Sequence, residues 1–538
     1  MLPSIVKSIN NRTLSRILIW KVPLAVLLVV LTLVTIPLPT IAQQLPPSPP
    51  TYWPTQGWQR TTTPEEAGID SAKLADALLT IREQDIDIHS LLIIRDGAVI
   101  LDAYFYPYDG SAFHDVASVS KSIMTTLIAI AAEQGKLELD QPVLSYFPNN
   151  NNNTIANLDT LKERITVRHL ASMSSGLNCT QEHDEATLRE MKASPDWVRF
   201  TLDREVIWEP GTTFVYCSPG MHLLSAILQH ATGMTALDFA RHNLFEPLGI
   251  QDVMWLTDPQ GYNRGSEGLY LHPYDMAKIG YLWLNNGQWQ GKQIVSQEWV
   301  NNSVKAQFET GEEGDEDDYG YGWWVQTDEE PQSYSASGRG GQRIIVVPAW
   351  NLIIATTGGG FSFDEIEPLL AASIVDMNNS LPVNQSAASK LQAALTAISQ
   401  PPAAQPVALL PDTAHVISGK TFVFEPNPLG IDKAQFEFNN SDNSSEAILH
   451  ITLTDGGQMP PWLIGLDGKY RLSPGEYNLP QGNRGHWVDA DTFMLEHDEI
   501  ANNDHILLLI HFAGDRLIVE GHETAHELGV RLEGRIQG

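Results

Sequence analysis

Ser118 and Lys121 have the residue types and the spacing that covalent catalysis needs. They lie in the stretch ASVSKSIM, residues 117–124, and residues three apart on a helix share a face. A serine hydroxyl is a weak nucleophile until a nearby base takes its proton. A lysine amine can be that base when burial removes the water that stabilises its charged form. The pattern is short, however, and Ser4 with Lys7 also matches it in the N-terminal segment.

The residues that follow Ser118 predict a helix that carries the pair. Gly135 is typical of the residue after a helix, and apolar residues recur before it at helical spacing: Ile123, Met124, Leu127, Ile128 and Ala131. Ser118 would then begin the helix, where its backbone NH could bind an oxyanion, while Ser120 and Ser122 would point elsewhere. The alternative is purely structural, with Ser118 as a helix cap and Lys121 on the surface. The segment by itself leaves both interpretations open.

Two later stretches carry groups that could serve the same reaction. The turn WEPG, residues 208–211, leads to FVYCS, in which Tyr216 and Ser218 precede another helical pattern. The Tyr216 phenol could move a proton between the nucleophile and a leaving group. Further on, the glycines of ASGRGGQ, residues 336–342, precede an apolar strand pattern and allow close backbone approach to a ligand. A backbone NH in this stretch could complete an oxyanion site.

The order of these motifs resembles the serine β-lactamase and penicillin-binding-protein superfamily. Its class C and esterase-like branch, with the 6-aminohexanoate-dimer hydrolase-like enzymes nearest, is also similar in the connecting stretches ITVRHLASMSSGL, WEPGTTFVYCSPGMHLLSAIL, FEPLGI and GLYLHPYDMAKIGYLWLNNGQWQGKQIVSQEWV. The resemblance covers residues 60 to 375 and implies a three-layer α/β (α+β) fold with an antiparallel sheet. It implies Ser118 as the acylating nucleophile, Lys121 as the base and Tyr216 as the general acid/base, with no metal or organic cofactor.

The glycine-rich strand departs from the family pattern. Many relatives carry KTG or HTG there, whereas this chain has Ala336, Ser337 and Gly338, which makes the Arg339 NH the implied second oxyanion donor beside that of Ser118. A shifted register would move the donor to Gln342, but the first register keeps a glycine just before the donor, as close approach requires. The missing lysine typically holds a substrate carboxylate, so its loss argues against a role in antibiotic resistance.

Two further departures concern substrate and water. Ser218 stands where the family usually has asparagine, which changes the contact to a substrate carbonyl. No deacylating glutamate of the class A kind is evident, so Tyr216 and Lys121 would have to activate the water that releases the acyl group. We therefore expect a serine hydrolase that cleaves an amide or ester bond of a small molecule.

Two other functions fit parts of the sequence. A protein of the same fold could bind peptidoglycan or β-lactams without turnover, acylating and holding or binding only. The segment 522–526 spells HExxH, in which His522 and His526 would bind zinc if they shared a helix face. The flanking residues read as strands, however, and the position six beyond His526 is Leu532, so a third zinc ligand is missing. We expect a turn between strands there, and no metal site.

The formal net charge of −32 over 538 residues repels polyanions, so nucleic acid is not an expected partner.

The N-terminal segment indicates an exported protein. Residues 1–42 read as a signal peptide, with four positive charges before or within an apolar run and Thr40-Ile41-Ala42 as a cleavage site; an uncleaved membrane anchor at residues 22–38 is the alternative. In an oxidising compartment the only two cysteines, Cys179 and Cys217, could form a disulfide, and two buried thiols fit equally well.

Composition divides the rest of the chain. A proline-rich linker at 43–60 precedes a large hydrolase domain at 61–380, in which hairpin patterns at both ends predict one antiparallel sheet built from the two chain ends. A segment rich in Ala, Ser, Gln and Pro at 381–412 reads as a second linker. Residues 413–538 are strand-like throughout and predict a β-barrel or sandwich domain.

Overall fold

A computed structural model describes residues 50–537 apart from a few short gaps, at 51, 62, 148–154, 180–184, 311–317, 328–329, 439–443 and 524–528. The predicted signal peptide, with its alternative of a membrane anchor, and His526 lie outside the described residues. Within the described part, no helix has the length and hydropathy that crossing a membrane requires. The chain from Pro49 onward forms one compact unit.

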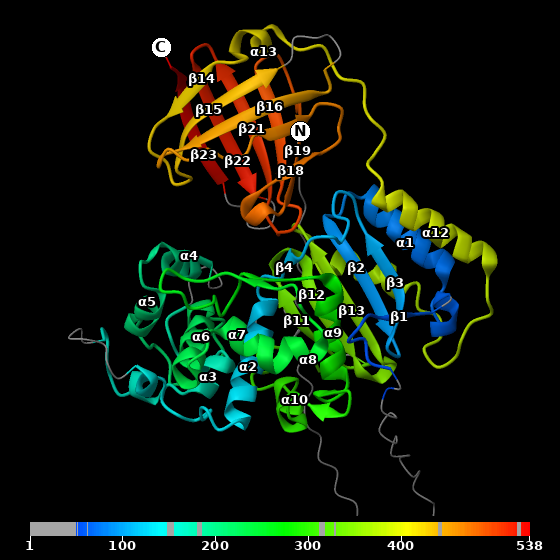
Figure 1. Ribbon diagram of the computed structural model, residues 1–538, viewed down its shortest axis with the longest axis vertical. Coiled ribbons are helices and arrows are strands. Elements are labelled where there is room, and N and C mark those ends of the chain that lie inside the picture. Colours follow the sequence, from blue (N-terminus) through cyan, green and yellow to red (C-terminus); the bar gives the residue numbers. More distant parts are fainter. Residues whose placement is uncertain are drawn as a thin grey trace, which may run out of the picture. The chain divides into compact units, whose positions relative to one another are not determined.

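An eight-stranded sheet, counted over the described residues, is the centre of the first domain (Figure 1). Its order is β1-β3-β2-β13-β12-β11-β10-β9, antiparallel except where β1 meets β3. The strands are β1 (Gln59–Arg60), β2 (Ile88–Arg95), β3 (Ala98–Tyr104), β9 (Asp318–Tyr319), β10 (Trp324–Gln326), β11 (Ser333–Gly338), β12 (Gln342–Val347) and β13 (Leu352–Gly358). Because β13 pairs with β2, the two ends of the domain meet in one sheet, as the hairpin patterns predict.

The turn between β2 and β3 follows directly from its sequence. Asp96 and Gly97 both have positive φ, 49° and 77°, as the two-residue type I′ hairpin turn requires. Successive side chains of a strand point to opposite faces of the sheet, and both faces of this sheet are buried. Leu92 and Ile94 belong to one apolar core, and Leu91 and Ile93 belong to another.

Helices cover both faces, which gives the predicted three layers (Figure 1). The first core contains α2 (Val119–Glu133), α6 (Ser218–Thr232) and α9 (Pro273–Leu284); the second contains α1 (Ser71–Glu83) and α12 (Gln385–Ser399). The remaining helices of this domain are α3 (Val167–Ala171), α4 (Glu185–Ala193), α5 (Trp197–Asp203), α7 (Ala236–Ala240), α8 (Glu246–Leu248), α10 (Gln297–Ser303) and α11 (Glu367–Ala371). Short strands complete it: β4 (His114–Asp115), β5 (Met254–Trp255), β6 (Leu269–Leu271), β7 (Gln288–Trp289) and β8 (Lys292–Gln293).

Helix α12 lies inside the range 381–412 that composition predicts as a linker. It packs beside α1 and buries Ala387, Leu391, Ala394 and Ile398 on one face, at the spacing of an amphipathic helix. The alanine-rich composition conceals this face, because only two of the four buried residues are large. Extended chain is therefore confined to the part of the range outside the helix, mainly residues 400–411.

The C-terminal segment is a closed β-barrel and not a sandwich. A short helix, α13 (Asp412–Ile417), leads into it, and nine of its described strands close because β17 also pairs with β19 at Gly465 and Arg484. Aromatic side chains fill one end of the interior: Phe422, Phe438, Trp487, Phe493 and Phe512. The strands are β14 (Thr421–Phe424), β15 (Ile431–Phe438), β16 (Glu446–Leu453), β17 (Trp462–Gly465), β18 (Arg471–Pro474), β19 (Pro480–Trp487), β20 (Thr492–Asp498), β21 (His505–Ala513), β22 (Arg516–Glu523) and β23 (Gly529–Ile536).

His505 at the start of β21 links the barrel to the first domain. Its Nδ1 lies 2.6 Å from Asp87 Oδ2 of the first domain, and its Nε2 lies 3.0 Å from Glu496 Oε1 of the barrel. Burial lowers the pKa of His505, but the two carboxylates outweigh it and raise that pKa to about 11. Burial likewise favours a neutral Glu496, yet the His505 hydrogen bond and Arg484 lower its pKa to about 2. His505 is therefore a partly buried imidazolium between two carboxylates.

We predict that His505→Gln lowers the free energy of unfolding by about 3 kcal/mol at neutral pH, because it removes a cation from between two carboxylates that are largely shielded from water. A raised pKa means that the folded state holds the proton more tightly. The contribution of His505 is therefore complete below about pH 6.5 and is lost as the pH rises toward 11. Urea unfolding between pH 6 and pH 10 measures this. The stability of the wild type should fall as the pH rises, and the variant should not show this fall.

His511→Gln is the matched control, since this exposed histidine lies on the same strand. If both variants are equally stable at all pH values, the ion network does not stabilise the fold.

Candidate active site

Ser118 lies at the N-terminus of α2, but its side chain does not cap the helix. Its hydroxyl makes no capping hydrogen bond to the helix backbone. Instead the Lys121 Nζ donates to Ser118 Oγ at 2.7 Å and to the Ser266 carbonyl at 3.1 Å. Lys121 is only 2% exposed. The geometry thus contradicts both halves of the structural interpretation, a capping serine and a surface lysine.

Burial of Lys121 follows from the sequence of α2 and from its place in the fold. Every residue from Val119 to Ala131 is buried, as expected for a helix enclosed between a sheet and other helices. Gly322, in the turn between β9 and β10, packs directly on α2: a Cβ there would lie 2.5 Å from Thr125 Oγ1 and 3.1 Å from the Lys121 carbonyl oxygen. Gly322 is not among the residues predicted from the sequence, where its only signal is the glycine-aromatic run YGYGWW at 319–324.

Tyr216 is the predicted phenol, and the structure brings it to the pair. The Lys121 Nζ lies 4.8 Å from the centre of the Tyr216 ring. The ring stacks on Trp324, with 5.9 Å between centroids and an interplanar angle of 21°, and meets Tyr319 edge-on. Ser218 is the first residue of α6 and is buried. Neither aromatic support was foreseen from the sequence, because both come from strands a hundred residues further on.

Gly338 ends β11 directly beside Ser118. A Cβ at Gly338 would lie 2.6 Å from the Val116 carbonyl oxygen and 3.0 Å from the Ser118 backbone nitrogen, so only glycine fits. Arg339 follows it at the turn into β12. Gln342, the donor of the alternative register, is fully buried and its side chain donates to the Gly358 carbonyl at 2.6 Å. The stretch around Gly338 is thus the one that approaches the serine.

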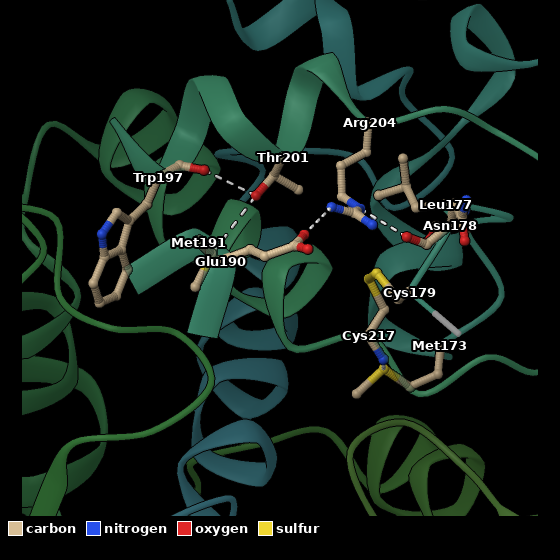
Figure 2. The surroundings of a disulfide bond; sticks show 11 residues. Met173, Leu177, Asn178, Cys179, Glu190, Met191, Trp197, Thr201, Arg204 and Cys217 are labelled. Atoms are coloured by element: carbon tan, nitrogen blue, oxygen red, sulfur yellow. Dashed lines mark hydrogen bonds and ion pairs between the residues drawn. A yellow bond between two sulfur atoms is a disulfide. The ribbon is translucent and has the colours of Figure 1, made fainter. Parts of the chain in front are cut away.

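A disulfide joins Cys179 to Cys217, which settles the alternative that the sequence left open (Figure 2). Cys217 lies between Tyr216 and Ser218 and is the N-cap of α6. Its backbone NH also donates to Met173 Sδ at 3.3 Å. The disulfide therefore ties the turn that carries Tyr216 to the segment that carries Cys179.

The C-terminal HExxH motif does not present a helix face at its first histidine. His522 is an exposed residue near the end of strand β22, and β23 begins at Gly529, as the predicted turn between strands requires. His526 lies outside the described residues. Among the described residues, no group of three or more His, Cys, Asp or Glu side chains is arranged so that it could hold a metal ion.

A serine hydrogen-bonded to a buried lysine at the start of a helix, beside a strand that ends in glycine, defines a serine hydrolase of the SxxK class. The comparisons with known proteins agree: the Beta-lactamase family matches residues 74–371, and the chain belongs to that family. The 6-aminohexanoate-dimer hydrolase of Paenarthrobacter ureafaciens is 25% identical over 310 residues, covering 54% of this chain and 78% of its own.

Solved structures of the same fold are more distant in sequence. EstCE1, described as a hydrolase with promiscuous acyltransferase activity, is 20% identical with a TM-score of 0.47 and covers 57% of this chain and 98% of its own. The octameric penicillin-binding protein homologue from Pyrococcus abyssi is 16% identical with a TM-score of 0.46 and covers 86% and 99%.

We predict that Gly338→Ala lowers the rate of hydrolysis at least tenfold while the protein still folds. The new methyl group would meet the backbone on either side of Ala117 and push the Ser118 turn away from β11. Turnover of an ester substrate and circular dichroism of the same sample measure the two effects. Gly529→Ala is the control, because a Cβ there meets nothing closer than 3.8 Å. Equal rates in both variants would contradict the close approach.

We also predict that the disulfide is a major source of stability. In the chain-entropy description, a cross-link spanning 38 residues contributes about 4 kcal/mol. The double variant Cys179→Ser/Cys217→Ser should therefore unfold at a clearly lower urea concentration than the oxidised wild type. Dithiothreitol should lower the stability of the wild type to that of the variant and leave the variant itself unchanged. A wild type that dithiothreitol does not affect, although mass spectrometry shows two free thiols, would refute this.

Proposed function

We propose that this protein is an exported serine hydrolase that cleaves an amide or ester bond through an acyl-enzyme on Ser118. The observation that carries the proposal is the Ser118 hydroxyl, which is 2.7 Å from the amine of a buried lysine and free of any capping role. A serine in this position has the base that its activation needs. The N-terminal segment of residues 1–42 supports export, because its charges and apolar run are those of a signal peptide.

In the first half-reaction, the Lys121 amine takes the Ser118 proton while Oγ attacks the substrate carbonyl carbon. The carbonyl oxygen becomes an oxyanion, which the backbone NH groups of Ser118 and Arg339 stabilise. Tyr216 passes a proton to the leaving amine or alcohol as the bond to the carbonyl carbon breaks, and the Lys121 proton restores the phenol. The acyl group is now bonded to Ser118 Oγ.

In the second half-reaction, Tyr216 and Lys121 relay one proton away from a water molecule, and its oxygen attacks the acyl carbon. The resulting tetrahedral intermediate loses its bond to Ser118 Oγ and releases the acid. The relayed proton returns to Ser118 Oγ. The enzyme thereby ends in its starting state, and neither step uses a metal or an organic cofactor.

Two departures from the family pattern bear on the substrate class. Ala336 stands where many relatives carry the lysine of KTG, so this strand offers no cation for a substrate carboxylate. Ser218 offers a hydroxyl in place of an amide for a substrate carbonyl. The relative from Paenarthrobacter is named for a dimer hydrolase and EstCE1 is described as a hydrolase. We infer a small neutral amide or ester rather than a β-lactam or nucleic acid.

A fluorophosphonate probe with intact-mass measurement tests the proposal. We expect one adduct on the wild type, no adduct on Ser118→Ala, and labelling at least 100-fold slower for Lys121→Met, since general-base catalysis contributes about 10²–10⁴-fold. Ser120→Ala is the matched control: its hydroxyl donates to the Ala117 carbonyl, and labelling should persist. An adduct that persists in Ser118→Ala would refute the assignment of the nucleophile.

Turnover separates the hydrolase from a protein that acylates and holds its ligand. A panel of p-nitrophenyl esters, short amides, D-amino-acid peptides and nitrocefin should give multiple turnovers on esters or amides. If every acylating compound instead leaves a permanent adduct on Ser118, the protein is a sensor or binding protein.

A further inference from the structure

A loop of the C-terminal barrel contacts both the segment that precedes Ser118 and the segment that follows Gly338. The loop joins β20 to β21, residues 499–504, and Asn503 within it is fully buried. The Asn503 Nδ2 donates to Asp115 Oδ2 at 3.2 Å, and Asn503 Oδ1 accepts from Arg339 Nε at 2.6 Å. One side-chain amide thus joins the segment that precedes the serine to the segment that follows Gly338.

The first of these segments is the turn that presents the nucleophile. Asp115 Oδ1 accepts from the Ala117 backbone NH at 3.0 Å, and the Asp115 NH donates to the Ala501 carbonyl at 2.9 Å. Ala117 has a φ of 45°, a conformation that costs free energy for a residue with a Cβ and persists only where the surroundings impose it. The barrel loop and Asp115 supply that constraint immediately before Ser118.

The second segment carries the proposed second oxyanion donor. Arg339 binds the loop twice, through Asn503 and through an ion pair with Asp504 at 3.2 Å. The next residue, Gly340, has a φ of 78°, and a Cβ there would lie 2.6 Å from the Cβ of Asn503. The loop therefore packs against the turn itself and restrains the backbone of the proposed Arg339 donor.

We propose that Asn503 is a positioning residue of the active site: it holds the nucleophile turn and the Arg339 turn in register, which makes the barrel a part of the hydrolase. The inference rests on the proposed function, since it concerns the same oxyanion site. An asparagine suits this place because its amide has one donor for the Asp115 carboxylate and one acceptor for the Arg339 guanidinium. An aspartate would set two carboxylates against each other, and a leucine would leave both partners unpaired.

The test reverses the polarity of the hydrogen bond between positions 503 and 115. Asn503→Asp removes the donor and places a second negative charge beside Asp115, and Asp115→Asn leaves two amide donors facing each other. In the double variant Asn503→Asp/Asp115→Asn, the amide at 115 donates to the carboxylate at 503, which still accepts from Arg339. We expect acylation by a fluorophosphonate and kcat for an ester to fall about 100-fold in each single variant, with KM little changed, because a small misplacement of reacting groups costs about that much. The double variant should recover most of the rate.

Asn427→Ala is the control, because Asn427 holds another barrel loop through hydrogen bonds to Ile431 and Glu425. It should lower the stability of the barrel and leave the acylation rate within twofold of the wild type. Thermal unfolding of every variant separates loss of fold from loss of positioning, and Asp115→Asn, which adds no charge, keeps the test valid if Asn503→Asp does not fold.

The outcomes distinguish a failure of the role proposed for Asn503 from a failure of the role proposed for Ser118. Folded single variants that acylate at the wild-type rate, or a folded double variant as slow as the singles, would overturn the role of Asn503 and leave Ser118 as the nucleophile. A wild type that takes no label on Ser118 would overturn both proposals.

Discussion

The burial of one amine, that of Lys121, is the constraint on which the rest of the site depends. An amine taken out of water needs hydrogen-bond partners nearby, and it finds them in Ser118 Oγ and the Ser266 carbonyl. The helix that carries it is enclosed on all sides, so the amine cannot swing out to solvent. The serine hydroxyl is consequently held beside a base and not beside the helix backbone, and this is what distinguishes a nucleophile from a helix cap.

The enclosure has to be built from segments that lie far apart in the chain. Gly322 and Gly338 let two backbones approach α2 more closely than any side chain would allow. The disulfide fixes the turn that carries Tyr216, and Trp324 supports the ring of that tyrosine. The barrel adds a loop from beyond residue 498 to the same place. Each contact restrains a backbone, which matters because oxyanion stabilisation acts through NH groups that must be aimed before the reaction begins.

Two contacts between the barrel and the hydrolase domain are polar and largely shielded from water. His505 lies between two carboxylates, and Asn503 lies between a carboxylate and a guanidinium. Such contacts are costly to break and specific in geometry, because an unpaired buried charge or amide loses its hydration without compensation. The barrel is therefore attached in a defined register, as a domain that contributes to a site needs to be. A flexibly tethered accessory module would not need this network.

The sequence by itself determined the fold class, the helix of Ser118 and the candidate reacting groups, since hydrophobic periodicity, turn residues such as Asp96-Gly97 and the motif order depend on local chemistry. It concealed α12, whose small buried alanines look like linker composition. Only the tertiary structure decided that Lys121 is buried, that Cys179 and Cys217 are bonded, that the C-terminal strands close into a barrel, and that Asn503 meets Arg339. These facts depend on which distant segments pack together, and a residue's own neighbours in sequence do not encode that.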